Sequence, residues 1–185
     1  TSQIAALSMT TIRGLSATDV GELSTTQLGA FSITQVSSLT ATAFAALDAT
    51  QVASLSTTQL RGMTAVQIGA LAAANMAEFT ATQLGSLATT QLAAFSATNI
   101  NSLDVTQLAG LTSTQMGGMT ATNLAALDVT QVQSLSTTQL SGLRTAQLLG
   151  LGVSDVNEFS AAQLASDRKS TRLNSSHTVI SYAVF

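Results

Sequence analysis

The side chains of this chain that could do chemistry are mainly hydroxyls and carboxylates. Serine and threonine are abundant, but a hydroxyl is a weak nucleophile until a neighbouring base takes its proton. The 185-residue chain has one histidine, His177, and one lysine, Lys169. Both lie in a C-terminal segment, 167–185, whose composition differs from the rest of the chain. Residues 1–166 thus offer no obvious base, and we predict no catalytic residues and no enzymatic activity.

Carboxylates could instead bind a cation, and Asp48, Asp104 and Asp128 occur in similar surroundings. Each precedes an x-T-Q sequence, where an aspartate serves the first amides of a helix as serine does. The chain has no cysteine, so a thiolate metal site is excluded. It contains neither GxGxxG nor GxxxxGK[ST], the glycine-rich patterns that bind nucleotide phosphates. The sequence therefore predicts no metal and no cofactor.

The elements that carry these residues repeat every eight residues. Every eighth residue from Leu7 to Phe159 is Leu, Met or Phe, and a second apolar series runs five residues later in each unit, from Ile12 to Leu164. The consensus is L-[S/T/D]-x-T-Q-[L/V/I]-x-x, and we number these positions 1 to 8. Apolar spacings of five and three fit neither a strand nor one long helix.

A short capped helix explains both spacings. Ser24 followed three residues later by Gln27 is the capping-box pattern. Leu23 and Leu28 then fall at N′ and N4, the two positions of a hydrophobic staple. Each unit is therefore predicted to form one short helix that begins at its own cap.

Helices of this length are unstable alone, so the units must stack on one another. Small residues at positions 7 and 8, such as Gly29, Ala30, Ala45 and Ala46, would allow close approach. We predict an all-α solenoid of short capped helical segments, one per eight-residue repeat, over residues 1–166. Asp48 and Asp104 lie seven units apart, as do Glu22 and Glu78, which hints at a longer grouping.

Several units depart from the consensus. The cap is lost at Ala72 and Ala88, and Arg144 and Gly152 replace it near the end. The glutamine is lost at Thr11, Asp19, Ala43 and Asp155. We expect these units to be the weakest of the array.

The eight-residue repeat stops at Asp167. The following sequence, DRKSTRLNSSHTVISYAVF, resembles translated sequencing adapter, in which Thr178 and Val179 would be a variable index. This resemblance implies that 167–185 is not native sequence and stands outside the fold. Because the chain also begins inside a unit, we expect residues 1–166 to be a fragment, open at both ends.

Charge limits the partners. Residues 1–166 contain three arginines and eight acids, a net charge of −5. An acidic surface without a basic patch argues against nucleic acid or an anionic membrane as partner. No apolar run approaches the roughly 20 residues of a membrane span. Neighbouring repeats of the same protein are the partners that the pattern predicts.

Residues Ile4 to Leu164 resemble the octapeptide L-[ST]-x-x-Q-[ILV]-x-x arrays of large bacterial repeat proteins, which are secreted or surface-attached and adhesin-like. The resemblance implies a structural or adhesive scaffold, outside the cell or on its surface. The alternative is a binding module that uses one polar Thr/Gln face for a glycan, a peptide or ice. Rows of threonine at position 4, from Thr10 to Thr138, suggest such a face.

Overall fold

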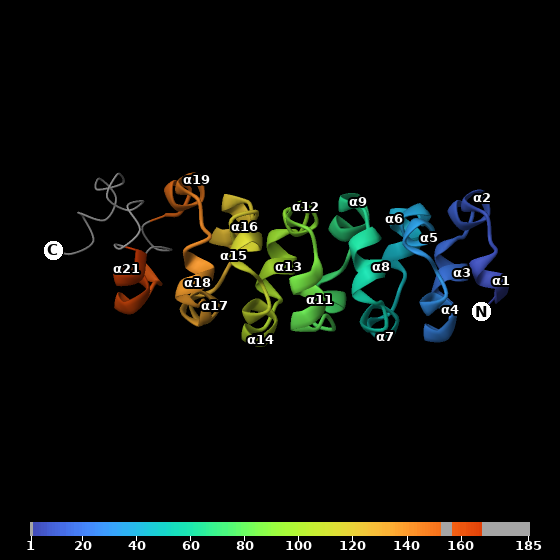
Figure 1. Cartoon of the computed structure of the whole chain (residues 1–185), viewed down its shortest axis with the longest axis horizontal. Coiled ribbons are helices and arrows are strands. Elements are labelled where there is room, and N and C mark those ends of the chain that lie inside the picture. The colour runs from blue at the N-terminus through green and yellow to red at the C-terminus, as the bar shows by residue number, and fades with distance from the viewer. Residues whose placement is uncertain (1, 153–156, 168–185) are drawn as a thin grey trace.

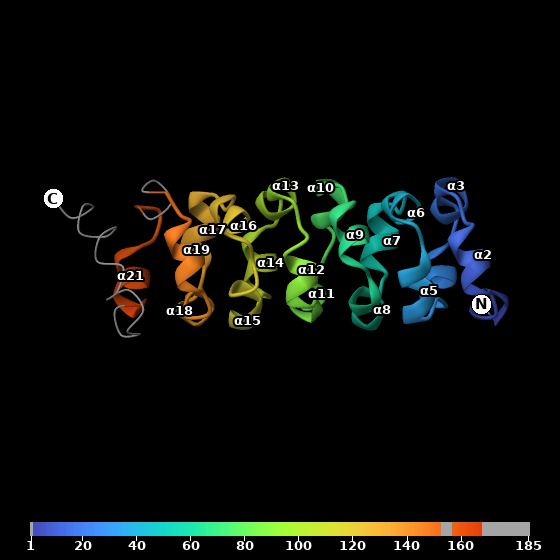
Figure 2. The ribbon, with the colours of Figure 1, turned by 90° about the horizontal axis from the view of Figure 1, so that it is seen from above.

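A computed structural model describes residues 2–152 and 157–167 of the chain. This part of the chain is helical, without strands, and its helices wind into an elongated rod from α1 at one end to α21 at the other (Figures 1 and 2). The predicted all-α solenoid of short helices is confirmed. The 167–185 segment lies outside the described residues except for Asp167, the last residue of α21.

The described helices follow the eight-residue repeat. Their bounds are α1 Ser2–Ala5, α2 Met9–Arg13, α3 Ala17–Gly21, α4 Thr25–Gly29, α5 Ile33–Ser38, α6 Ala41–Ala45, α7 Ala49–Ala53, α8 Thr57–Gly62, α9 Ala65–Gly69, α10 Ala73–Met76, α11 Ala81–Ser86, α12 Thr89–Leu92, α13 Ala97–Asn101, α14 Val105–Ala109, α15 Ser113–Met116, α16 Ala121–Ala125, α17 Val129–Ser134, α18 Thr137–Leu140, α19 Thr145–Leu149 and α21 Ala161–Asp167.

Helix α4 shows how a unit forms. The Ser24 hydroxyl accepts a hydrogen bond from the Gln27 amide at 3.2 Å, and the Gln27 side-chain oxygen accepts one from the Ser24 amide at 2.8 Å. These are the two bonds of a capping box. Leu23 and Leu28 flank the cap at N′ and N4, where Leu28 is fully buried and Leu23 packs on the core. The predicted cap and staple are confirmed.

The coil of the solenoid holds about three and a half units. Each helix packs on the helix three units further along, as in α3 on α6, α5 on α8 and α14 on α17. Side-chain hydrogen bonds link residues 28 and 31 apart along the whole rod, for example from Gln59 to Phe31 and Leu28. Twenty-eight residues equal 3.5 units of eight, so seven units make two coils. Asp48 and Asp104, 56 residues apart, therefore lie on the same side of the rod.

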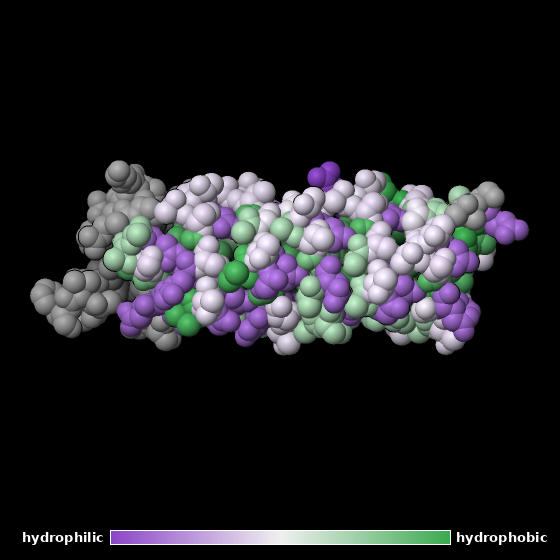
Figure 3. Space-filling view, turned by 90° about the horizontal axis from the view of Figure 1, so that it is seen from below, coloured by the Kyte–Doolittle hydropathy of each residue, from purple (hydrophilic) through white to green (hydrophobic). Residues whose placement is uncertain are grey.

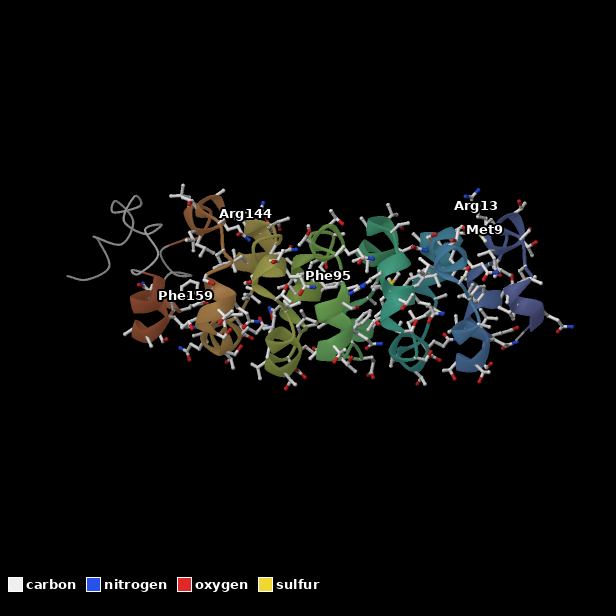
Figure 4. The ribbon with its side chains drawn as sticks, in the orientation of Figure 1. Met9, Arg13, Phe95, Arg144 and Phe159 are labelled. Atoms are coloured by element: carbon white, nitrogen blue, oxygen red, sulfur yellow. The ribbon has the colours of Figure 1, made fainter. Side chains whose placement is uncertain are left out.

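The two apolar series meet inside the rod. Positions 1 and 6 are buried from Leu28 to Leu143 and form one continuous hydrophobic core. Met63, Met76, Met116 and Met119 belong to it. Phe95 lies between the helices of the rod and Phe159 points toward its interior near the C-terminal end (Figure 4). Burial of two large apolar side chains per unit is the main stabilising contribution of the stack.

Small residues at position 8 allow neighbouring coils to touch. Gly62 lies against Ile33, 29 residues earlier, and Gly142 lies in the same way against Ser113. Ser38 and Met9 form the equivalent pair, in which the Ser38 hydroxyl lies 3.2 Å from the Met9 sulfur. The expected role of small residues is correct for position 8. It is also correct for Gly85 and Gly117 at position 7, where an added Cβ would meet the carbonyl oxygens of Gly110 and Gly142 in the next coil. Gly29, also at position 7, has no atom close to where its side chain would be.

This contrast predicts opposite effects of two glycine substitutions. A Cβ added at Gly142 would overlap the Ser113 carbonyl oxygen, so Gly142→Ala should lower the free energy of unfolding by about 1–3 kcal/mol. Gly29→Ala should raise it by about 0.5–1 kcal/mol, because alanine is the better helix former and meets open space. Urea denaturation of both variants measures the difference. Equal effects of the two substitutions would show that the coils are not in contact at position 8.

None of the helices within residues 2–152 and 157–167 is long and apolar enough to cross a membrane.

Candidate functional surface

The ionisable side chains of the rod are separated from one another. Across residues 2–152 and 157–167, no three His, Cys, Asp or Glu side chains come together as a metal site would require. Asp48, Asp104 and Asp128 are N-caps, and each accepts a hydrogen bond from the backbone amide of the glutamine three residues later, at 2.7 to 2.8 Å. Their carboxylates therefore cap the helices that follow them.

Asp19 takes the place of the glutamine in its own capping box. Its carboxylate accepts hydrogen bonds from the Ser16 amide at 2.8 Å and the Ser16 hydroxyl at 2.7 Å. These two donors, the backbone amide first, lower the pKa of the Asp19 carboxyl below its ordinary value. The charged form is thus favoured by folding.

A pH titration can test this cap. Because the folded pKa is the lower one, the stability that Asp19 contributes is present above the pKa of unfolded aspartate and is lost as the pH falls through the folded pKa. NMR titration of the Asp19 carboxyl carbon should give a lower midpoint in the folded chain than in the same chain in concentrated urea. Coincident midpoints would contradict the capping role.

A ladder of buried amides joins successive coils. Fifteen glutamine and asparagine side chains at N3 are buried, and they are Gln35, Gln51, Gln59, Gln67, Asn75, Gln83, Gln91, Asn99, Gln107, Gln115, Asn123, Gln131, Gln139, Gln147 and Gln163. In Gln91, the side-chain oxygen accepts from the Ala88 amide at 2.8 Å. Its Nε2 donates to the Leu60 carbonyl at 2.8 Å and the Met63 carbonyl at 2.7 Å. One side chain thus caps its own helix and bonds the coil before it.

The second role follows from the backbone between helices. The carbonyl of position 1 lies between two helices at a buried residue, and a buried carbonyl without a partner costs about 1–3 kcal/mol. Glutamine from the next coil supplies the donor, as Gln115 does for Leu87 at 2.8 Å. Among the described residues, every buried side-chain nitrogen or oxygen has a hydrogen-bond partner. The sequence analysis explained the recurrent glutamine by its role in the capping box. It did not predict that the same side chain links two coils.

Asparagine fulfils only part of the role, because it is one methylene shorter. Asn75 and Asn99 donate to the carbonyls of Leu47 and Leu71, each at 3.0 Å. Asn123 reaches the Leu92 carbonyl at 3.5 Å. For none of the three is the second capping-box bond found. At Ala43 the N3 side chain is a buried methyl group.

Threonine dominates the exposed surface. Position 4 carries an exposed threonine in fifteen units, at Thr10, Thr18, Thr26, Thr34, Thr42, Thr50, Thr58, Thr82, Thr90, Thr98, Thr106, Thr114, Thr122, Thr130 and Thr138. The expected Thr/Gln face is wrong for glutamine, because the N3 amides of the inner coils are buried. Since a coil holds about 3.5 units, the threonines are distributed around the rod. Hydrophilic and hydrophobic residues alternate in small patches on the face in Figure 3.

The cap and the exposed threonine make a matched pair of substitutions. In α8, the Ser56 hydroxyl accepts from the Gln59 amide at 3.2 Å, whereas Thr58 is exposed. Ser56→Ala should lower the free energy of unfolding by about 0.5–2 kcal/mol, and Thr58→Ala should change it by less than about 0.5 kcal/mol. Thermal and urea denaturation compare the two. An equal loss in both would show that the Ser56 cap does not stabilise α8.

A shallow depression opens between α13 and α16. It is lined by Ala97, Thr98 and Asn101 of α13, by Ala125 of α16, and by Ser102 and Ala126, the residues that follow these two helices. Small side chains leave this hollow, and three polar groups border it. Its lining contains no ionisable side chain.

Comparisons with protein-family models, with curated proteins and with solved structures gave no match for the chain.

Proposed function

We propose that residues 1–166 form a structural or adhesive repeat region that acts as a spacer and multivalent surface of a larger protein. The supporting observation is the amide ladder, which joins successive coils by the same bonds along the rod. Each added coil therefore lengthens the rod by a similar step and exposes a similar polar surface. By adding coils, such an array can increase the distance that it spans and the number of contacts that it makes with a partner.

The resemblance to bacterial octapeptide arrays supports a location outside the cell or on its surface. The separation of ionisable groups supports a non-catalytic role, because catalysis needs differing groups that converge in one place. The direct partners that we assign are the neighbouring repeats of the same protein. A cell-surface or glycan partner is the further possibility that an adhesive role implies.

Duplicating two coils tests this function. A second copy of residues 47–102 inserted after residue 102 adds seven units, or two coils, without rotating one end of the rod relative to the other. We expect small-angle X-ray scattering to show a longer rod of unchanged thickness. We also expect adhesion to bacterial cells or polysaccharide-coated beads to rise with the added coils. A rod of unchanged length, or adhesion independent of repeat number, would contradict the proposal.

The competing function is a binding module for a glycan, a peptide or ice. The exposed threonines favour it, since they offer many hydroxyls at regular intervals. They surround the rod, however, and a flat ice-binding face would need them on one side. A module of this kind would keep its full adhesion when repeat number changes, which separates it from the spacer in the same experiment.

A further inference from the structure

One side of the rod departs from the repeat in every coil. We define the coil place of a residue as its number after multiples of 28 are subtracted, since 28 residues separate the bonded coils. The described N3 residues that are not glutamine are Thr11, Asp19, Ala43, Asn75, Asn99 and Asn123, at coil places 11, 19, 15, 19, 15 and 11. At coil places 23, 27, 3 and 7, the described N3 residue is always glutamine.

Five of these six residues lie on helices that follow one another along the rod, whereas Thr11 lies on α2, outside this row. Figure 2 shows α3, α6, α10, α13 and α16 in a row along its upper edge. Contacts of α3 with α6, of α10 with α13 and of α13 with α16 agree with this arrangement. These five deviations from the consensus thus form one longitudinal strip.

The acids lie on the same side. Within residues 2–152 and 157–164, the seven carboxylates are Asp19, Glu22, Asp48, Glu78, Asp104, Asp128 and Glu158, at coil places 19, 22, 20, 22, 20, 16 and 18. We call the side that carries them the acidic face. Arg61 and Arg144, at places 5 and 4, lie on the opposite side, and Arg13, at place 13, lies at the border of the face. Figure 4 shows Arg13 and Arg144 pointing outward from the upper edge of the rod.

The glutamates of this face have no structural explanation in the repeat. Glu22, Glu78 and Glu158 occupy position 8, which is Gly, Ala or Ser in all other described units. Glu22 and Glu78 are exposed and follow the last residues of α3 and α10, where a negative charge is disfavoured by the helix dipole. Residues that lower the stability of their own helix indicate a function other than folding, such as binding.

The shape of the face indicates the kind of partner. The depression of Ala97, Asn101 and Ala126 lies at coil places 13 to 18, within the strip. Its polar side chains, Thr98, Asn101 and Ser102, can bond a polypeptide backbone. The carboxylates are distributed over several coils and do not converge as a metal site within the described ranges, so their charge matches a long cationic partner rather than an ion.

We propose that the acidic face docks an extended polypeptide rich in lysine or arginine, which lies along the rod and crosses the depression between α13 and α16. This inference rests on the proposed function in one respect, because it assigns the multivalent contacts of the rod to one side. It adds the chemistry of the partner and the residues that select it.

Moving the charges to the other side of the rod tests the proposal. The neutral-face variant of the full chain carries Glu22→Gln, Asp48→Ser, Glu78→Gln and Asp104→Ser, which keep the N-caps. The relocated variant adds Thr34→Glu, Thr58→Glu, Thr90→Glu and Thr114→Glu, at coil places 6, 2, 6 and 2, and restores the native net charge. These threonines are exposed at N2, where a glutamate favours the helix. Circular dichroism verifies that all three chains are folded.

The probe is a fluorescent 20-residue peptide of alternating lysine and serine, and the readout is anisotropy at low and at physiological salt. We expect the native chain to bind it and the neutral-face variant to bind about tenfold more weakly or worse. The relocated variant should remain equally weak. Absence of binding to the native chain, or native affinity in either variant, would overturn the inference. Rod length and its growth on duplication of residues 47–102 do not depend on these charges, so the spacer function is judged separately.

Discussion

Leu60→Ala is expected to lower the free energy of unfolding by about 2–5 kcal/mol. Leu60 occupies N4 of α8, where its side chain is fully buried. Helix α8 packs on α5 in the coil before and on α11 in the coil after. Removing the side chain therefore leaves a cavity in a core that continues through both junctions, and backbones held by cross-coil bonds have little freedom to close it.

Leu55→Ala at position 1 should have a cost in the same range, because Leu55 is 3% exposed in the same core. Thr58→Ala in the same helix is the matched control. Urea denaturation followed by circular dichroism gives the free energies. If both leucine variants lost less than about 1 kcal/mol, the two apolar series would not form the core that the structure shows.

The helices and their core could be predicted because their signals lie within eight residues. Ser24 and Gln27 are three positions apart, and Leu23 and Leu28 flank them, so one unit contains its own cap and staple. The structure places all four residues in these roles. A repeated local pattern of this kind fixes helix boundaries more firmly than propensity alone.

The size of the coil could not be predicted in the same way. It depends on which carbonyl accepts a hydrogen bond from the side-chain amide of Gln59. This is the Phe31 carbonyl, 28 residues earlier in the chain. No eight-residue pattern contains that distance, because 28 is not a multiple of eight. The trace in the sequence was the spacing of 56 residues between Asp48 and Asp104, which equals two coils.

The strip of units without glutamine at N3 was missed for a related reason. A consensus averages all units together, so Ala43, Asn75, Asn99 and Asn123 look like scattered exceptions to glutamine. Their separations are 32, 24 and 24 residues, which is four, three and three units. A mixture of three-unit and four-unit separations is expected for a coil of about 3.5 units, and it can be recognised once the cross-coil bonds are known.

Gln91→Leu should lower the free energy of unfolding by about 2–4 kcal/mol. Leucine fills a similar space, but it leaves the Met63 carbonyl and the Ala88 amide without the partners that Gln91 provides at 2.7 and 2.8 Å. Each buried group that loses its partner costs about 1–3 kcal/mol. The Leu60 carbonyl also loses its bond from Gln91, but it still accepts one from the Met63 amide at 3.1 Å. This third lost bond should therefore cost less free energy.

Two further substitutions distinguish the stability that glutamine contributes as a helix cap from the stability that it contributes by bonding the neighbouring coil. Gln27→Leu removes a glutamine whose side-chain oxygen accepts from the Ser24 amide and hydroxyl in the first coils of the rod, so it should cost only about 1 kcal/mol. Gln91→Asn should fall between the two leucine variants, because Asn75 and Asn99 keep the bond to the position 1 carbonyl. Equal losses for Gln91→Leu and Gln27→Leu in urea denaturation would mean that the amide acts only as a cap. A clear excess for Gln91→Leu would assign the difference to the junction between coils, which is the bond that lets the rod lengthen one coil at a time.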